Sequence, residues 1–304
     1  MVGAIMQRLK GMAVVFFLRI LAFLPLSTAR LVGRGFGEVL YRCRSRACAV
    51  AQVNLALCYP NADPQWRDRV CRARMTHLAQ TAFETPGLWR RSMPWLHAHI
   101  VDIVGKNCFE ASLEQDSGTI FLIPHQGNWE VAGLWIAQYT RMTSLYEPPK
   151  LAALETLVKT ARERSGASLV PTNARGVAAL LKAIKAGQST GILPDQQPPE
   201  SGGIFSPFFG VPALSMTLVH RLLQRCDARV VLCAALRKPG GWSLHFTEAD
   251  GAIYSSDQAA SLDALNRGVE QIVNLEPEQY LWEYKRFRKQ PIGSPSVYDN
   301  LNNR

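Results

Sequence analysis

Apolar residues follow different patterns on the two sides of about residue 100. Before it, apolar positions recur at helical spacing. Val50, Val53 and Leu57 form one stripe, and a second periodic stretch runs from Trp66 to Leu88 after a turn of Pro, Asn and Asp residues. After it, short apolar runs rich in β-branched and aromatic residues alternate with helical periodicity. The first third of the chain is therefore predicted to be helical, and the rest to alternate strands with helices.

The alternating part predicts a sheet with helices on its faces. Strands are expected at 101–105, 119–124, 167–171, 191–195, 228–236 and 242–246. Helices are expected at 129–141, 151–164, 175–186, 214–225 and 257–274. Apolar strands separated by helices are typical of an α/β fold with a mixed, largely parallel sheet flanked by helices. Ligands bind at the carboxyl ends of the strands in such sheets, so we expect the functional site there.

The most apolar run of the chain, GMAVVFFLRILAFLP, lies at 11–25. It is short for a membrane span and contains Arg19. Basic residues flank it on both sides, which favours a cytoplasmic location for the downstream part of the chain, and the lack of a good cleavage site predicts that the run is retained. We predict an N-terminal membrane-associated helix in an anchoring segment at 1–40, followed by one large domain at 41–304. The helix could span the bilayer or lie in its interface, and a buried helix of a soluble protein is the alternative.

Charge narrows the range of partners. The 304 residues include 34 Lys and Arg against 24 Asp and Glu, a net charge of +10. This suits an anionic partner such as a phospholipid surface, a phosphorylated glycolipid, an acidic carrier protein or nucleic acid. No nucleic-acid-binding module accompanies the basic cluster KRFRK at 285–289, so nucleic acid is not expected. The seven cysteines form no CxxC pair, so we expect reduced thiols and no metal site.

The strongest candidate site is the turn HQGNWE at 125–130, which joins the strand expected at 119–124 to the next helix. Glu130 should lie in the first helical turn, where the helix dipole favours a carboxylate. From there it could accept a hydrogen bond from one imidazole nitrogen of His125 and leave the other to take a proton from a substrate hydroxyl. Backbone amides of the turn and Asn128 could face an oxyanion. His125 and Glu130 are thus predicted to be catalytic, and a surface or capping position is the simpler interpretation of each.

Six further segments match a known family in the same order: VNLALCYP at 53–60, YEPPK at 146–150, ARERSG at 161–166, GILPDQ at 191–196, FSPFFGVPA at 205–213 and PEQYLWEYKRFRKQP at 277–291. Together with the spacing of His125 and Glu130, they resemble the late acyltransferases of lipid A biosynthesis, the lauroyl and myristoyl transferase family of Gram-negative bacteria. The signature of that family is His, four residues, then Asp or Glu. The signature alone is weakly specific, whereas the ordered set covers most of the chain and is a strong indication.

Three more residues are predicted to bind substrate. Arg164 belongs to the segment resembling the family's Arg-x-Arg block, where a forked guanidinium could hold a lipid A phosphate or a carrier phosphopantetheine. Arg175 precedes a predicted helix, an unfavourable place for a cation without an anionic partner. Asp195 ends the strand expected at 191–195. Compensation of helix-end charge by Arg164 and capping of a turn by Asp195 are the simpler interpretations.

The resemblance implies a glycerolipid-acyltransferase-like fold and transfer of a fatty acyl chain to a hydroxyl of a lipid A precursor. The acyl donor would be acyl carrier protein, as co-substrate and without another cofactor. The implied location is the inner membrane, with the catalytic domain on its cytoplasmic face and in contact with membrane phospholipids. A lysophospholipid or another membrane glycolipid is the alternative acceptor. A non-catalytic, basic membrane-binding protein is the alternative from another class.

Overall fold

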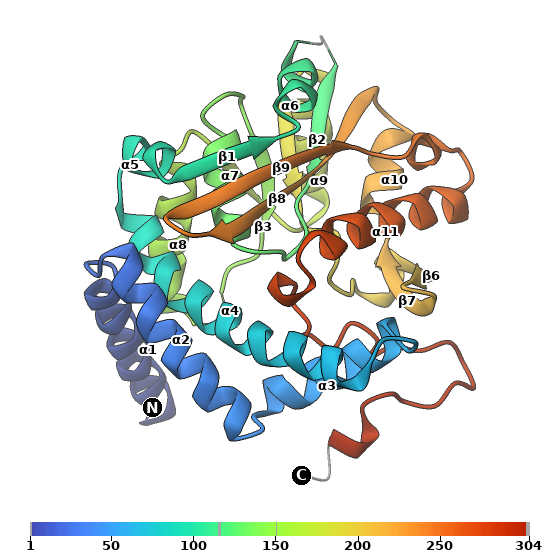
Figure 1. The fold of residues 1–304 in the computed structure, drawn as a ribbon. Helices are drawn as coiled ribbons and strands as arrows, with labels where there is room; N and C mark the ends of the chain where they lie inside the picture. The colour runs from blue at the N-terminus through green and yellow to red at the C-terminus, as the bar shows by residue number, and fades with distance from the viewer. Residues whose placement is uncertain (1, 115–116, 150, 302–304) are drawn as a thin grey trace.

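The computed structural model describes residues 2–114, 117–149 and 151–301. Its first hundred residues are helical, as predicted, and the sheet follows them (Figure 1). The N-terminal helices are α1 (Val2–Leu21), α2 (Leu26–Arg42), α3 (Arg46–Cys58), α4 (Pro64–Arg90) and α5 (Met93–Ala98).

A five-stranded sheet forms the centre of the molecule. Its strands are β1 (Ile100–Val104), β2 (Gly118–Leu122), β5 (Ser189–Ile192), β8 (Ala228–Lys238) and β9 (Gly241–Glu248), in the spatial order β1-β9-β8-β2-β5. β2 runs parallel to both of its neighbours, β5 and β8, and β1 runs parallel to β9. β8 and β9 pair in antiparallel fashion, as a hairpin. The predicted mixed, largely parallel sheet flanked by helices is confirmed.

The remaining elements surround this sheet. A parallel pair consists of β3 (Thr143–Tyr146) and β4 (Ser168–Pro171), and an antiparallel hairpin consists of β6 (Gly203–Phe208) and β7 (Val211–Met216). The helices are α6 (Lys106–Leu113), α7 (Trp129–Ile136), α8 (Glu155–Glu163), α9 (Ala174–Lys185), α10 (Leu218–Leu223) and α11 (Gln258–Leu275). Short 3₁₀ turns occur at 152–154, 200–202, 251–254, 277–279 and 299–301.

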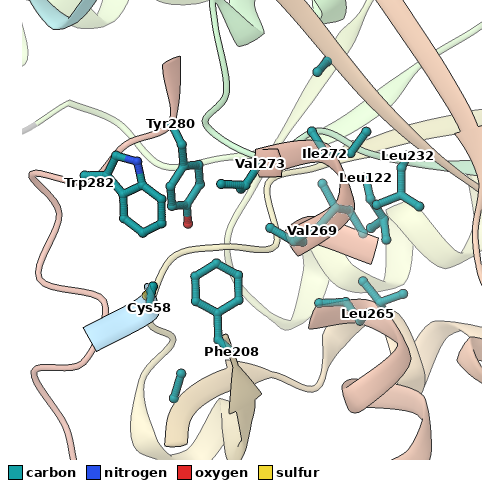
Figure 2. Close-up of a cluster of buried hydrophobic side chains, with 14 of the residues drawn as sticks. Cys58, Leu122, Phe208, Leu232, Leu265, Val269, Ile272, Val273, Tyr280 and Trp282 are labelled. Atoms are coloured by element: carbon teal, nitrogen blue, oxygen red, sulfur yellow. The ribbon is translucent and has the colours of Figure 1, made fainter. Parts of the chain in front are cut away.

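Successive residues of the interior strand β2 face opposite cores. Ile120 and Leu122 belong to the core that α11 covers, and Phe121 packs with α7 on the other face. Figure 2 shows part of the first core, where Leu265 and Val269 of α11 lie near Leu122. A strand covered on both faces has to be apolar throughout, which explains why 119–124 carries no polar alternation.

Two predicted segments differ from the structure in type. The helix expected at 214–225 begins as strand β7, and α10 starts only at Leu218. The Pro- and Gly-rich segment that follows residue 195, for which neither a strand nor a helix was predicted, contains strand β6. Pro207 and Pro212 face each other in this hairpin, where a two-stranded sheet leaves room for residues without an N–H group. In addition, the helix expected at 129–141 ends at Ile136.

No helix in the described part of the chain has both the length and the apolar character needed to cross a bilayer. Helix α1 has 20 residues and contacts α4 and the 3₁₀ turn at 152–154. Helix α2 ends at Arg42 and so runs across the expected boundary between 1–40 and 41–304. The anchoring role of the first segment and the two-part division stay predictions.

Helices α2 and α4 lie side by side along one edge of the molecule (Figure 1). They can approach closely because α2 places glycines against α4. A Cβ added at Gly37 would lie 2.4 Å from the Thr76 Cα, and one added at Gly33 would lie 2.7 Å from the Gln80 Cα. Both distances are below any that real Cβ atoms show, so this contact requires glycine.

We therefore expect Gly37→Ala to destabilise the protein. Forcing α2 away from the α4 backbone should cost about 1–3 kcal/mol of unfolding free energy, measured by denaturant titration. Gly35→Ala is the matched control, because an added Cβ there meets no atom within 4 Å. In α2 it should be neutral or stabilising by up to about 1 kcal/mol. Equal effects of the two changes would contradict the close packing of α2 on α4.

Candidate active site

His125 lies just beyond the carboxyl end of β2, in the turn that leads to α7. Gly127 has a φ of +62°, and a Cβ at this position would lie 2.0 Å from the Ala235 carbonyl oxygen. The turn is fixed to its surroundings because the Asn128 N–H donates to the Ala235 carbonyl and the Gly127 N–H to the Gln279 carbonyl. The candidate base is thus held at the predicted edge of the sheet by a turn that only glycine allows.

The carboxylate that orients His125 is Asp195. Its Oδ1 accepts a hydrogen bond from Nδ1 of the imidazole at 2.8 Å, and its Oδ2 accepts one from the His125 backbone N–H at 2.8 Å. Asp195 follows β5, the neighbour of β2, so the two residues meet at adjacent carboxyl ends of parallel strands. Both side chains are buried. The sequence interpretation assigned Asp195 to substrate and the orienting role to Glu130, and for the hydrogen-bond partner of His125 this assignment was wrong.

The environment of Asp195 keeps it ionised. Burial by itself raises the pKa of a carboxyl group, but the charge of His125 and its hydrogen bonds hold the pKa of Asp195 below its ordinary value. An ionised carboxylate is an acceptor only, so the imidazole must carry its proton on Nδ1. In the neutral ring Nε2 is then the acceptor, and it accepts a hydrogen bond from the Gln196 side-chain amide at 3.2 Å. The arrangement is that of a general base with a fixed tautomer.

Glu130 does lie in the first turn of α7, as predicted, but its side chain points to α8. The Arg162 guanidinium donates from Nη2 to Glu130 Oε1 at 2.5 Å, and from Nε to both carboxylate oxygens at 3.1 Å. Burial lowers the pKa of Arg162, yet the charge and hydrogen bond of Glu130 outweigh this effect and raise it. The expected bond to His125 is absent because Nδ1 of the imidazole is bonded to Asp195 and the Glu130 carboxylate is bonded to Arg162.

Two cavities meet at the Glu130–Arg162 ion pair. The inner cavity, of about 130 Å³, lies between α7 and the strands β3, β4 and β5 and is lined mainly by apolar side chains, among them Ile123, Leu134, Met142, Leu145 and Leu193. The outer groove, of about 460 Å³, lies between α1, α4 and α8 and is also mainly apolar. Trp129, Glu130 and Arg162 line both. The region beside the candidate base can therefore accommodate hydrocarbon.

The other predicted ligands lie in different settings. Asn128 donates its side-chain amide to Glu84 Oε1 at 3.0 Å, so this donor is already used within the protein. Arg164 donates to the backbone carbonyls of Leu88 and Arg91, at the end of α4. Arg175 is exposed at the start of α9 and its guanidinium has no partner among the described residues. Their roles in substrate binding stay predictions.

The expected oxyanion site in the turn is also occupied. The backbone N–H groups of residues 125–128 donate to Asp195, Pro124, Gln279 and Ala235 respectively. A donor for a developing oxyanion must therefore come from outside these backbone groups. The Gln196 side-chain amide, which is hydrogen-bonded to His125 Nε2, is the candidate. The sequence interpretation quoted Gln196 only as part of a motif and did not pair Arg162 with Glu130. Gln196 directly follows Asp195 at the predicted edge of the sheet, and this position was the available signal. Arg162 lies within α8, so its place in the sequence did not indicate Glu130 as its partner.

Residues 5–289 match the family described as bacterial lipid A biosynthesis acyltransferase. The chain is 25% identical over 284 residues to the lipid A biosynthesis palmitoleoyltransferase of Escherichia coli K12, with 90% of each chain covered. It is 24% identical over 282 residues to the lauroyltransferase of the same organism, again with 90% of each chain covered. It is 26% identical over 293 residues to a lipid A biosynthesis acyltransferase of Haemophilus influenzae, with 94% of this chain and 89% of that one covered. The chain belongs to the bacterial lipid A biosynthesis acyltransferase family.

Proposed function

We propose that the protein transfers a fatty acyl chain from the thioester of acyl carrier protein to a hydroxyl group of a lipid A precursor. The observation that carries this proposal is His125, which Asp195 orients so that Nε2 can accept a proton, and whose neighbour Trp129 lines two apolar cavities, in a chain of the lipid A acyltransferase family. The net charge of +10 supports an acidic carrier and a phosphorylated acceptor as partners.

The chemistry requires one proton relay. His125 Nε2 takes the proton of the acceptor hydroxyl as its oxygen attacks the thioester carbonyl, and Asp195 stabilises the imidazolium that forms. The Gln196 amide is placed to donate to the oxyanion of the tetrahedral intermediate. Collapse of this intermediate breaks the C–S bond, and the departing thiolate takes the proton from the imidazolium. The products are the ester and the free thiol, with no covalent acyl-enzyme.

The Glu130–Arg162 pair has a second role in this proposal. Because it separates the inner cavity from the outer groove, we assign the acyl chain of the donor to the inner cavity and hydrocarbon of the acceptor to the outer groove. Glu130 then acts near the reacting groups through Arg162, a cation beside the thioester, instead of through His125. In this proposal Glu130 remains part of the active site. It acts through Arg162, whereas its spacing from His125 had predicted a hydrogen bond to the imidazole.

Attachment to the cytoplasmic face of the inner membrane is part of the proposal. The large apolar side chains that α1 and α2 expose include Phe16, Phe17, Ile20, Leu31 and Phe36, each at least half exposed. Exposed apolar side chains next to basic residues suit a helix that lies in the membrane interface. This arrangement would bring the outer groove, which includes Leu18 of α1, close to lipid.

The direct test is to incubate the purified protein with defined acyl-carrier-protein thioesters and lipid A precursors, and to analyse the products by mass spectrometry. We expect the acceptor mass to rise by one acyl chain. Lysophospholipids offered in parallel should be poor acceptors. Acylation of a lysophospholipid alone would instead support the alternative acceptor, and no product with any pair would support a non-catalytic protein.

His125→Ala should fold normally and reduce acyl transfer by about 10²–10⁴-fold, because the base is lost. Asp195→Asn should cause a loss of similar order, because the amide can stabilise the tautomer in which Nε2 carries the proton. The double variant should be little worse than either single one. Asp227→Asn is the control, since Asp227 is exposed and accepts no side-chain hydrogen bond among the described residues. Near-normal turnover of folded His125→Ala would remove the general-base assignment.

The ion pair can be tested separately from the base. Arg162→Gln leaves Glu130 buried without a partner and should cost about 3–5 kcal/mol of unfolding free energy, whereas Glu130→Gln should cost about 1–3 kcal/mol. The double variant should lose less than the sum of the two. Lys159→Gln, which removes an exposed pair with Glu163 on the same helix, should change stability by less than about 0.5 kcal/mol. Additive losses would contradict the pairing.

Membrane attachment predicts a loss of vesicle binding when exposed apolar residues of α1 are removed. Phe16 is 67% exposed and Phe17 is 53% exposed, so Phe16→Ser with Phe17→Ser should leave the fold intact. Co-sedimentation with phospholipid vesicles should weaken at least about tenfold, because each buried aromatic contributes roughly 1.5–3 kcal/mol. Ile292→Ser removes an exposed apolar side chain outside α1 and α2 and should have no effect. Unchanged binding of the double variant would mean that another surface attaches the protein.

A further inference from the structure

A third cavity lies away from the His125 turn, between α2, α4, α5 and the turn that joins β8 to β9. This basic cavity has a volume of about 720 Å³. In Figure 1 the β8–β9 turn lies beside α5 and the start of α2. The cavity is lined by Arg30, Arg34, Arg91, Arg237 and Lys238, with His77, His99 and Trp95. None of the described residues that line it is acidic.

The basic cavity has more positively charged side chains than there are carboxylates paired with them. Five side chains with a permanent positive charge line it, and two carboxylates pair with members of this set from behind: Glu84 with Arg30 and Arg237, and Glu276 with Lys238. Arg34 is exposed, and its guanidinium has no partner among the described residues. A concave site with this excess of positive charge is suited to an anion.

Several of these side chains are already held in position. Arg30 donates to the Lys238 carbonyl at 2.7 Å and to the Gly241 carbonyl at 2.8 Å. Arg237 donates to Thr81 Oγ1 at 2.7 Å and to His77 Nδ1 at 2.7 Å. Since the His77 ring accepts this bond, it is neutral there, and burial together with Arg237 lowers its pKa to about 3. An anion would meet a rigid wall, with the unpaired Arg34 at its edge.

Apolar side chains lie at the basic cavity and close to it along the chain. Leu26 and Trp95 line the cavity and are partly buried, whereas Phe23 and Leu31 lie outside its lining and are 65% and 66% exposed. The Arg91 guanidinium stacks over the Trp95 ring with a separation of 4.8 Å. A ligand that carries both an anion and hydrocarbon fits this combination of basic and apolar side chains.

We infer that the basic cavity binds the phosphate-bearing head group of an anionic phospholipid, which does not take part in the reaction. Its phosphate interacts with Arg34 and Arg91, and its acyl chains follow the exposed apolar surface of α1 and α2. The site rests on the proposed attachment to a membrane, to which it adds selectivity for the head group. It is distinct from the candidate active site, because none of the described residues lines both the basic cavity and either the inner cavity or the outer groove.

The test measures binding without a bilayer, an acyl donor or an acceptor. Isothermal titration calorimetry of the full chain would use dihexanoyl phosphatidylglycerol below its micelle concentration, with dihexanoyl phosphatidylcholine and glycerol phosphate as comparison ligands. We expect saturable binding of phosphatidylglycerol, weaker binding of the other two, and about fivefold weaker binding by Arg34→Gln. Arg19→Gln is the matched control, because it removes an exposed, unpaired charge from the same apolar surface but outside the cavity.

A second variant distinguishes binding in the basic cavity from non-specific electrostatic attraction to the protein surface. Ser27 is exposed and lines the basic cavity, so Ser27→Phe fills part of it while leaving every charge in place. It should weaken phosphatidylglycerol binding at least about tenfold, although it adds apolar surface. Absence of saturable binding, equal affinity for glycerol phosphate or phosphatidylcholine, or full binding by Ser27→Phe would each overturn the inference. Failure of acyl transfer or of vesicle attachment would leave this measurement unaffected.

Discussion

The buried carboxylate of Glu84 ties the helical half of the molecule to its sheet. It lies on α4 and accepts hydrogen bonds from Arg237 of β8, Arg30 of α2 and the Asn128 side chain at the start of α7. Burial raises the pKa of a carboxyl group, yet the two guanidinium groups and the amide lower the pKa of Glu84 to about 2. A buried charge is tolerated only when it is paired in this way, so these four elements must assemble together.

This arrangement explains why the turn around His125 is rigid on both sides. One side is fixed to β8 through the Ala235 carbonyl and to the 3₁₀ turn at 277–279 through the Gln279 carbonyl. The other side is fixed to the helices through Asn128 and Glu84. The imidazole itself is oriented by Asp195 from the neighbouring strand. Its position therefore depends on contacts from four separate parts of the chain, which is the kind of preorganisation that proton transfer requires.

The sequence predicted the elements of the fold better than their contacts. The apolar run at 119–124 marks a strand buried on both faces, and His125 follows it, so the place of the candidate base could be inferred. Its partner could not, because the neighbours of a strand depend on strand order, and β5 lies beside β2 although β3, β4 and three helices come between them in the chain. Glu84 was equally hidden, since an acidic residue in a long helix with many basic residues resembles a solvated side chain. Strand β6 was missed because its glycine and proline are typical of loops.

Different parts of the chain position the base and form the walls of the outer groove. His125 and Asp195 come from neighbouring strands of the central sheet, whereas the outer groove is walled by α1, α4 and α8. Displacement of α1 could therefore open or close the route for lipid without moving the imidazole relative to its carboxylate. In kinetic terms, changes in the N-terminal helix should appear in the entry and release of substrates, while the proton-transfer step stays the same.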